Sequence, residues 1–239
     1  MGQESLALTV QDNILFDAAR NPTPHATWFE PRYWLDAHKA RVTQGGRGNV
    51  LFIDDADNHW VLRHYRRGGL IGKLIHDRYI WTGAEATRSF RELRLLAALQ
   101  QQGLPVPAPI AARYVRCGLS YRADLLTAAV PNARTFAECL IHDALPLAVW
   151  QRVGKTLARF HAAGVQHADL NANNILIDAQ EQVWLLDFDR GRIRAMDQQW
   201  IDAVLARLLR SLNKLRERKG LQFTETEWLA LKAAHDAPY

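Results

Sequence analysis

The amino-acid sequence predicts an α+β fold in two lobes: a small β-rich N-terminal lobe that holds one helix, and a mainly helical C-terminal lobe. Strand-like segments dominate the first half and are interrupted by one helical segment, whereas three helical segments fill most of the second half. Among these helical segments, two short apolar runs flank a polar turn, a pattern typical of a β-hairpin. The 239 residues suffice for two small lobes, which we expect at residues 1–127 and 128–239.

In the N-terminal lobe, a weak strand signal at residues 12–16 comes first. Residues 49–53 and 59–65 look like two strands joined by the turn at residues 54–58. Residues 87–102 have helical periodicity and are followed by Gly103, a residue type that commonly ends helices. Two more strands are expected near residues 111–116 and 120–127. We also expect an aromatic cluster in the core, made of Trp28, Phe29, Tyr33 and Trp34.

The C-terminal lobe has three predicted helices, at residues 135–142, 146–163 and 197–218. The last of these carries apolar side chains at intervals of three and four residues, which is typical of a helix packed on a core. The predicted hairpin lies between the second and third helices and pairs residues 175–178 with residues 182–186.

Composition limits the classes of protein that this chain can belong to. A hydrophobic fraction of 48% and a charged fraction of 23% are globular values. No apolar run reaches 18 residues, so we expect no transmembrane helix, and the N-terminus lacks the features of a signal peptide. Cys117 and Cys139 are expected to be small core hydrophobes in a reducing compartment. The net charge of +5 fits nucleic acid, an anionic membrane surface or an acidic substrate, and does not choose among them.

Three polar residues have a spacing that suits metal-assisted phosphoryl transfer: Asp169, Asn174 and Asp187. On the predicted hairpin, Asn174 stands at the start of one strand and Asp187 follows the end of the other. Two oxygen ligands for a metal ion and a nearby base carboxylate would then share one site. Asp and Asn are also common in ordinary turns. The joint spacing on a hairpin, rather than any single residue, favours the site.

Residues that could contact nucleotide phosphates lie in the N-terminal lobe. The cluster Gly45-Gly46-Arg47-Gly48 precedes a predicted strand that contains Val50, and glycines allow the backbone to approach phosphate oxygens closely. On the next strand, Val61 and Arg63 share one face because side chains alternate along a strand. Glu92 shares a helix face with three leucines: Leu95, Leu96 and Leu99. A carboxylate in such a stripe should pair with a cation, for which Arg63 is the natural candidate, unless Glu92 reaches solvent at the edge of the stripe.

These motifs resemble the protein-kinase superfamily. The segment from His167 to Asn174, with Asp169 third, stands in the place of H-R-D-x-x-x-x-N, and Asp187-Phe-Asp189 stands in the place of D-F-G. The resemblance implies a bilobal protein-kinase-like fold with ATP and Mg²⁺ as cofactors. Asp169 would accept the proton of the substrate hydroxyl, and Asn174 and Asp187 would hold Mg²⁺. Asp189 replaces the usual glycine, and could bind metal or cap the following turn.

The resemblance also assigns the nucleotide site. It implies that the ATP phosphates lie against Gly45, Gly46, Arg47, Gly48, Val50, Val61, Arg63 and Glu92. Thr43 stands where the first glycine of the G-x-G-x-x-G-x-V motif is usual. Arg63 stands where kinases have a lysine that contacts the α- and β-phosphates. Arginine keeps the charge but presents a planar fork instead of a point charge. We expect Arg63, rather than a neighbour such as Lys73, to take the role of the lysine.

A finer resemblance is to the bacterial lipopolysaccharide kinases that act on 3-deoxy-D-manno-octulosonic acid (Kdo), and it is carried by residues 61–69, 159–171 and 187–191. It implies phosphorylation of the 4-hydroxyl of Kdo in Kdo-lipid IVA by a cytoplasmic enzyme attached peripherally to the inner membrane. The lack of an A-P-E segment after Asp187 also argues against a protein substrate. Basic side chains that could pair with this anionic acceptor and with an anionic membrane surface are Arg66, Arg67, Arg190 and Arg192.

Other functions remain open from the sequence alone. Among enzymes, the alternatives are a heptose kinase of the lipopolysaccharide core and a small-molecule kinase like the aminoglycoside phosphotransferases. A basic nucleic-acid-binding module would explain the pI of about 9.4 but not the spacing of Asp169, Asn174 and Asp187. A pseudokinase is suggested only by Arg63 in place of lysine. We therefore expect no nucleic-acid partner and see no sign of an obligate protein partner.

Overall fold

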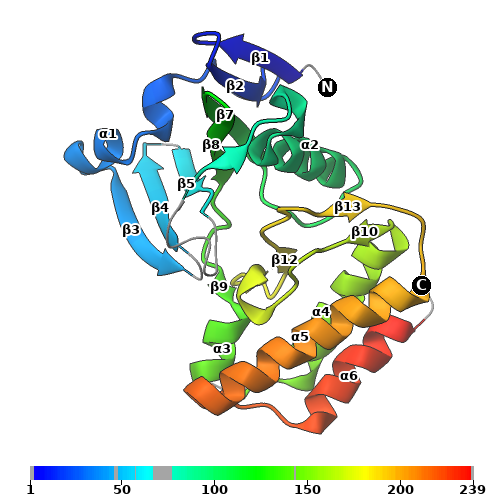
Figure 1. The fold of residues 1–239 in the computed structure, drawn as a ribbon. Coiled ribbons are helices and arrows are strands. Elements are labelled where there is room, and N and C mark those ends of the chain that lie inside the picture. Colours follow the sequence, from blue (N-terminus) through cyan, green and yellow to red (C-terminus); the bar gives the residue numbers. More distant parts are fainter. Residues whose placement is uncertain (1–2, 46–47, 57, 67–76, 143, 238–239) are drawn as a thin grey trace. The chain divides into compact units, whose positions relative to one another are not determined.

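Strands dominate the first half of the chain and helices the second, which confirms the predicted α+β fold (Figure 1). This arrangement comes from a computed structural model that describes residues 3–45, 48–56, 58–66, 77–142 and 144–237. The chain divides into unit 1, Met1–Ala98 with Pro107–Ala129, and unit 2, Leu99–Val106 with Val130–Tyr239. Residues 99–106 are tied into unit 2 by contacts such as the Leu185 N–H, which donates to the Pro105 carbonyl at 3.1 Å.

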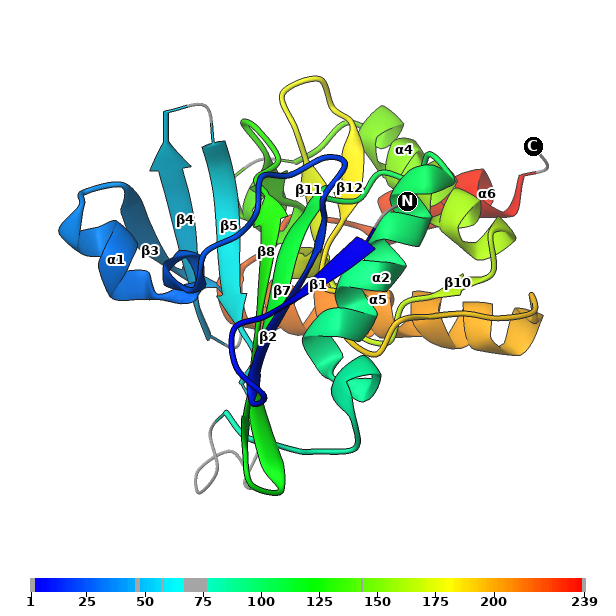
Figure 2. The same ribbon diagram turned by 90° about the horizontal axis from the view of Figure 1, so that it is seen from above.

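Unit 1 is built on an antiparallel sheet. Within the described residues, its strands follow the order β1-β2-β7-β8-β5-β4-β3, and β6 pairs with β8 (Figure 2). The strands are β1 (Gln3–Ala7), β2 (Asp12–Asp17), β3 (Ala40–Gly45), β4 (Gly48–Asp55), β5 (Asn58–His64), β6 (Tyr79–Ile80), β7 (Pro109–Cys117) and β8 (Ser120–Ala128). The helices are α1 (Pro31–Asp36) and α2 (Arg88–Gln101), with 3-10 turns η1 (Ala26–Phe29) and η3 (Ala84–Ala86).

Alternation along β4 and β5 gives this part of the sheet two different faces. Leu51, Ile53, Trp60 and Leu62 point into a hydrophobic core that also holds Phe29 and Trp34. The predicted aromatic cluster is therefore partly confirmed, although Tyr33 is 49% exposed. The residues between the core positions lie on the opposite face, because successive side chains of a strand alternate. Val50, Val61 and Arg63 occupy this second face, and Val50 pairs directly with Arg63.

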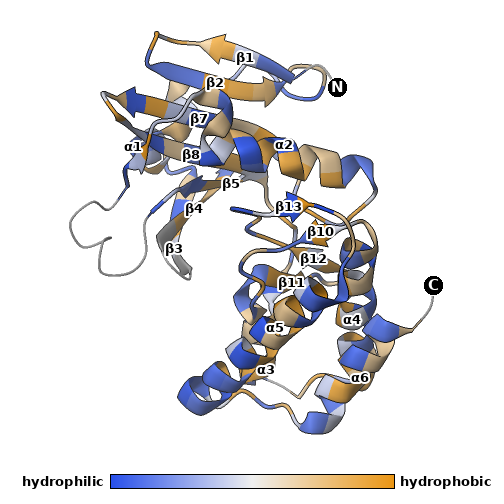
Figure 3. Cartoon of the chain, turned by 45° about the vertical axis from the view of Figure 1, so that its right-hand side comes forward, coloured by the Kyte–Doolittle hydropathy of each residue, from blue (hydrophilic) through white to orange (hydrophobic). Residues whose placement is uncertain are grey.

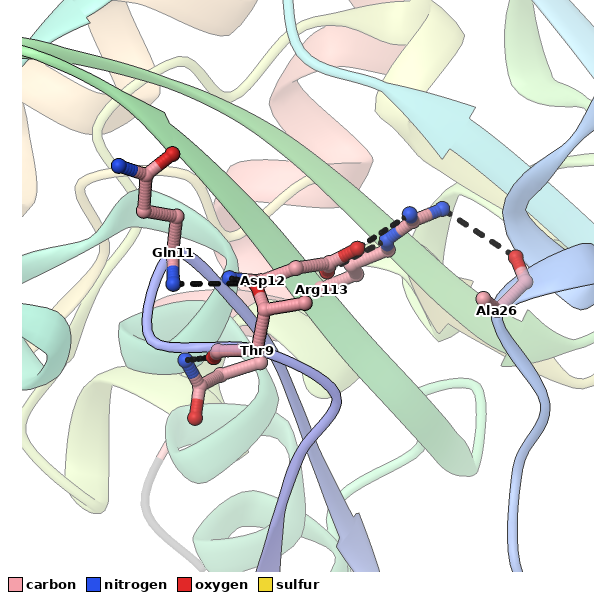
Figure 4. Close-up of polar contacts among 6 residues, drawn as sticks. Thr9, Gln11, Asp12, Ala26 and Arg113 are labelled. Carbon is pink, nitrogen blue, oxygen red and sulfur yellow. Dashed lines mark hydrogen bonds and ion pairs between the residues drawn. The ribbon is translucent and has the colours of Figure 1, made fainter.

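An ion pair joins β2 to β7 across the sheet (Figure 4). The Arg113 guanidinium donates to both carboxylate oxygens of Asp12, at 2.8 and 2.6 Å, and to the carbonyl of Ala26 at 3.2 Å. Thr9 Oγ1 accepts from the backbone N–H groups of Gln11 and Asp12, which closes the β1–β2 turn. A bidentate arginine–carboxylate pair is among the stronger polar contacts in proteins. It fixes the edge strands to the central sheet.

Unit 2 is mainly helical. Its helices are α3 (Phe136–His142), α4 (Leu147–Ala162), α5 (Gln198–Lys219) and α6 (Glu225–Asp236). Its short strands are β9 (Arg134–Thr135), β10 (Val165–Gln166), β11 (Ile175–Ile177), β12 (Val183–Leu185) and β13 (Arg192–Ile193), with a 3-10 turn η4 (Ala172–Asn174). Hydrophobic and hydrophilic residues alternate along α4 and α5, as amphipathic helices require (Figure 3). No helix among the described residues is both long and apolar enough to cross a membrane.

Capping residues set the limits of the long helix α5. The Asp197 carboxylate accepts from the N–H of Gln199 at 2.7 Å, which satisfies a donor at the start of the helix. At the other end, Gly220 takes a left-handed conformation with φ of 68°, which glycine adopts without strain. The predicted helix at residues 197–218 is thus confirmed to within one residue at each end.

The main predicted elements are present, and several small ones were not predicted. The strands at 49–53, 59–65, 111–116 and 120–127, the hairpin and all the predicted helices are found at or near their expected positions. Sequence reasoning missed the helices α1 and α6 and the strands β1, β3, β6, β9, β10 and β13. Cys139 is buried as expected, but the expectation is wrong for Cys117, which is exposed at the end of β7.

Candidate active site

The loop that carries Asp169 is held by its own asparagines. It runs from β10 through η4 and enters β11 at Ile175. The amide groups of Asn171 and Asn174 both donate to the backbone carbonyl of Asp169, at 2.8 and 3.0 Å. Asn171 Oδ1 accepts from the N–H of Asn173 at 3.0 Å, which starts η4. These bonds fix the backbone at Asp169 while its carboxylate remains about one-third exposed, at 32%.

The hairpin brings Asn174 to the backbone that precedes Asp187. Strands β11 and β12 are antiparallel, and Ile175 pairs with Leu185. One position further out, the Leu186 N–H donates to the Asn174 carbonyl at 2.9 Å. The predicted hairpin, with Asn174 at the start of one strand and Asp187 just after the other, is confirmed.

His167 connects the loop that carries Asp169 to the end of the hairpin at Leu186. It is buried, its Nε2 lies 2.8 Å from the Leu186 carbonyl, and its Nδ1 lies 3.1 Å from the backbone nitrogen of Asp169. A carbonyl can only accept and a backbone N–H can only donate, so Nε2 carries the proton and Nδ1 accepts. Burial lowers the pKa of His167, which favours this neutral form, although the Leu186 carbonyl acts in the opposite direction. A second proton on the ring would remove the acceptor that holds Asp169.

The four contacts form a closed ring of hydrogen bonds. Asp169 is bonded to His167, His167 to Leu186, Leu186 to Asn174, and Asn174 back to Asp169. Phe188 is buried beneath this ring and stacks on Phe160, with ring centroids 5.8 Å apart. Two of the three polar residues singled out by their spacing, Asp169 and Asn174, therefore belong to one hydrogen-bonded ring, and Asp187 directly follows its member Leu186.

The backbone is strained at the end of the hairpin. Asp187 has φ of 60° and Arg190 has φ of 62°, values that cost energy for residues other than glycine. Asp is among the residues that tolerate this conformation best, because its short side chain can bond locally. Strain of this kind persists only where surrounding contacts impose it. Here the buried Phe188 and the Leu186 backbone bonds flank Asp187.

The chemistry of Asn174 and Asp187 fits a magnesium ion. Because Asn174 donates through Nδ2 to Asp169, its oxygen Oδ1 is left to accept or to ligate. Mg²⁺ prefers oxygen ligands and usually takes one or two carboxylates together with substrate phosphates and water. One amide oxygen and one carboxylate match that demand. The described residues contain no cluster of three or more His, Cys, Asp and Glu side chains suited to a metal held by protein alone.

The expected ion pair of unit 1 is present. Glu92 lies in the buried face of α2, where its side chain is 2% exposed, and its Oε2 lies 2.5 Å from Arg63 Nη2. The alternative of a solvent-exposed Glu92 is wrong, because the helix face that it occupies packs into the unit. Tyr65 supplies a second partner that the sequence did not suggest: its hydroxyl donates to the same carboxylate oxygen at 2.5 Å. The Arg63 guanidinium also lies over the Tyr65 ring, 4.7 Å from its centroid.

The residues expected to contact phosphates lie on the two hairpins that start at β3. Gly45 and Gly48 pair with each other at the end of β3 and the start of β4. Gly46 and Arg47 lie outside the described residues. Val50 lies opposite Arg63, and Val61 is two positions before Arg63 on the same strand face. Val50, Val61 and Arg63 thus form a continuous surface on the sheet.

The basic residues expected to bind an acceptor are exposed where they are described. Arg66 is exposed after β5, and Arg190 and Arg192 are exposed after Asp187, whereas Arg67 lies outside the described residues. Sequence reasoning missed a cation that lies close to Asp169. Arg207, on α5, has its Nη1 3.5 Å from Asp169 Oδ1. Thirty-eight residues separate the two, and no sequence pattern points from one to the other.

Comparisons with known proteins agree with this geometry. The sequence model of the lipopolysaccharide kinase (Kdo/WaaP) family matches residues 32–235. A protein of Stenotrophomonas maltophilia (strain R551-3) named 3-deoxy-D-manno-octulosonic acid kinase is 46% identical over 224 residues, which cover 93% of this chain and 89% of that protein. Proteins of the same name from Xanthomonas campestris pv. campestris (strain B100) and Xylella fastidiosa (strain M12) are 45% and 42% identical, with the same coverage. The family match spans both units and includes every residue of the Asp169–Asn174–Asp187 site, so the chain belongs to the lipopolysaccharide kinase (Kdo/WaaP) family.

Proposed function

We propose that this protein transfers the γ-phosphoryl group of ATP to the 4-hydroxyl of the Kdo residue in Kdo-lipid IVA. Family membership and relatives named 3-deoxy-D-manno-octulosonic acid kinase over 93% of the chain support a kinase that acts on this sugar acid. The observation that carries the proposal is the ring of hydrogen bonds that joins Asp169, His167 and Asn174 to the residue before Asp187. It provides a base and two oxygen ligands in one preorganised unit.

In this proposal each side chain of the site has its own role in phosphoryl transfer. Asp169 accepts a hydrogen bond from the acceptor hydroxyl, orients it and takes its proton as the oxygen attacks phosphorus. Asn174 and Asp187 would hold Mg²⁺, which would supply positive charge to neutralise the phosphate oxygens. Arg63 and the turn between Gly45 and Gly48 contact the nucleotide phosphates. His167 keeps the backbone of Asp169 fixed, and so acts by positioning.

The place of action follows from the acceptor. Kdo-lipid IVA is a membrane lipid, so the enzyme must work at the membrane surface, and we place it on the cytoplasmic face of the bacterial inner membrane. The exposed side chains of Arg66, Arg190 and Arg192 provide cations that can approach anionic headgroups and acceptor phosphates. Attachment by charge is weakened by salt.

The test compares Asp169→Asn with the wild type in transfer of labelled phosphate from ATP. We expect turnover on Kdo-lipid IVA to fall by at least roughly 100-fold, because the loss of a general base commonly costs that much. Thermal unfolding should remain near that of the wild type, because the Asp169 side chain is partly exposed and its ion pair with the half-exposed Arg207 is long. Asp202→Asn, an exposed carboxylate of α5, is the matched control and should retain activity.

Acceptor identity is settled in the same assay. Heptosylated core and an aminoglycoside are offered beside Kdo-lipid IVA, and the phosphorylated position of the product is mapped by mass spectrometry and NMR. Label on heptose, label on the aminoglycoside, or a fully active Asp169→Asn variant would each contradict the proposal.

A further inference from the structure

Arg207 lies beside the proposed catalytic carboxylate. Its Nη1 is 3.5 Å from Asp169 Oδ1, and the two side chains are 48% and 32% exposed. This separation exceeds the usual length of a charge-assisted hydrogen bond. A long contact between two half-exposed side chains contributes little to the free energy of unfolding. Stability therefore does not explain why a cation lies at this position.

The helix holds Arg207 at the catalytic loop firmly. Val204, Leu205 and Leu208, the neighbours of Arg207 along α5, are buried and anchor this stretch of the helix. One turn beyond Arg207, the Ser211 hydroxyl accepts from the N–H of Ala172, three residues after Asp169, at 3.3 Å. The charge also acts on the loop itself: burial is the main cause of the lowered pKa of His167, and Arg207 adds to it. The packing of α5 thus places the Arg207 cation beside the loop that carries Asp169.

Most of the hydrogen-bonding capacity of Arg207 is still open. A guanidinium has five N–H donors in a planar fork that matches a carboxylate. Among the described residues, the contact from Nη1 to Asp169 is the one polar contact found for Arg207. The fork therefore retains donors next to the place where the acceptor hydroxyl must lie.

We propose that Arg207 is a specificity-determining residue that binds the carboxylate of the sugar acid while Asp169 binds the hydroxyl to be phosphorylated. This inference rests on the proposed function. In a 3-deoxyoctulosonic acid, the carbon of the 4-hydroxyl is separated from the carboxyl carbon by two carbons, so both groups fit against adjacent side chains. A neutral hexose or heptose has no carboxylate to pair with this fork, and its hydroxyl groups offer only weaker, uncharged acceptors. The pairing of Asp169 with Arg207 would thus select an acidic sugar and fix which hydroxyl faces the base.

The experiment uses the full-length protein, two variants of Arg207 and two acceptors. The acceptors are Kdo-lipid IVA and the same glycolipid with the Kdo carboxylate converted to the carboxamide. For Arg207→Gln, we expect the KM for the carboxylate acceptor to rise roughly 10- to 100-fold, as for loss of a hydrogen bond to a charged group. The KM for ATP should stay unchanged. Arg207→Lys should give an intermediate KM, because an ammonium keeps the charge without the fork.

The carboxamide acceptor makes the assignment specific. The wild type should use it poorly, and Arg207→Gln should then cause little further loss, because the partner of Arg207 is already missing. The matched control is Arg210→Gln, which removes an exposed arginine about one turn further along the same helix. It should behave as the wild type does toward both acceptors.

Two results would overturn the inference. One is an unchanged KM for Kdo-lipid IVA in Arg207→Gln. The other is an equal loss of turnover on both acceptors, which would mean that Arg207 acts on Asp169 and not on the carboxylate. A wild-type enzyme that does not phosphorylate Kdo-lipid IVA at all would refute the proposed function itself, together with this inference.

Discussion

At the scale of single residues, the contacts of Arg63 with Glu92 and Tyr65 account for an arginine at position 63. Kinases generally have lysine where this chain has arginine. Here the partner carboxylate of Glu92 accepts from both Arg63 and the Tyr65 hydroxyl, and the guanidinium lies over the Tyr65 ring. A planar guanidinium can stack on a ring and donate to a carboxylate at the same time, whereas an ammonium cannot. The arginine is therefore suited to a site that pairs a buried carboxylate with an aromatic neighbour.

This arrangement predicts a large penalty for breaking the pair from one side. Arg63→Ala removes the cation that lies against the buried Glu92 carboxylate, and we expect a loss of roughly 3 kcal/mol in the free energy of unfolding. Arg63→Ala combined with Glu92→Gln should recover part of that loss, because the uncompensated charge is gone. Urea unfolding of the two variants and the wild type measures both effects. Arg41→Ala, which removes an exposed arginine over the Phe52 ring, is the control. Equal losses in the single and double variants would contradict a charge-based explanation.

The sequence predicts some residue contacts and not others for a physical reason. The Arg63–Glu92 pair was predictable because a carboxylate in an apolar helical stripe requires a cation, and one strand offered it. The approach of Asn174 to the residue before Asp187 was predictable because a hairpin is local, so spacing along the chain becomes distance in space. Arg207 and Asp169 come together only through the packing of α5. Contacts of that kind depend on tertiary structure and leave no periodic signal.

At the scale of elements, α4 and α6 pack unusually closely at Gly154. A methyl group built on Gly154 would lie 2.1 Å from the backbone carbonyl oxygen of Leu231 and 3.1 Å from the backbone nitrogen of His235. Glycine inside a helix is ordinarily unfavourable by about 1 kcal/mol relative to alanine. The close approach of α6 explains why α4 has a glycine at position 154. Helix α6 itself was not predicted, because much of the helix is exposed and Leu231 is its one fully buried residue.

Gly154→Ala is therefore expected to destabilise the protein although alanine favours helices. We expect the free energy of unfolding to fall by about 1 to 3 kcal/mol, the usual cost of overpacking against a neighbour that cannot move away cheaply. Urea unfolding measures this change. Gln151→Ala, at an exposed position of the same helix, tests helix propensity alone and should be close to neutral. A stabilised Gly154→Ala variant would mean that α6 does not pack on α4 at this position.

Two-residue strands show the limit of prediction at this scale. Val165–Gln166 and Arg192–Ile193 pair with each other, and Arg134–Thr135 pairs with β11. None is long enough to show alternation, and the first two are partners across an intervening hairpin. The pairing of these short strands is decided by the positions of larger elements. The long helices and the long strands of the sheet show a periodic pattern and were predictable, whereas these short strands were not.

At the scale of the whole molecule, two histidines give the stability opposite dependences on pH. In unit 1, the hydrogen bond from His64 to Asp124, 2.6 Å long, raises the pKa of His64 despite partial burial. In unit 2, burial together with the nearby charges of His235 and His167 lowers the pKa of His161 to about 3. His161 packs between the Trp200 ring of α5 and His235 of α6.

The sign of each contribution follows from linkage. For His161 the folded pKa lies below the unfolded value of about 6.5, so its contribution is full above that pH. It is lost as the pH falls toward about 3, because the unfolded chain takes up a proton that the folded chain excludes. For His64 the folded pKa lies above the unfolded value, so its contribution is full below about pH 6.5 and disappears as the pH rises through the folded pKa.

We therefore expect His161→Asn to weaken the loss of stability in acid. Between pH 7.5 and 5, the unfolded-state proton at His161 costs the wild type about 2 kcal/mol, and the variant should be spared that part of the loss. His64→Asn should do the reverse and make the loss in acid steeper, because it removes a contribution that is present only at low pH. Urea unfolding of the three proteins at both pH values measures these differences, with His142→Asn, an exposed histidine at the end of α3, as the matched control. Parallel pH dependences in all the variants would show that neither buried histidine governs acid stability.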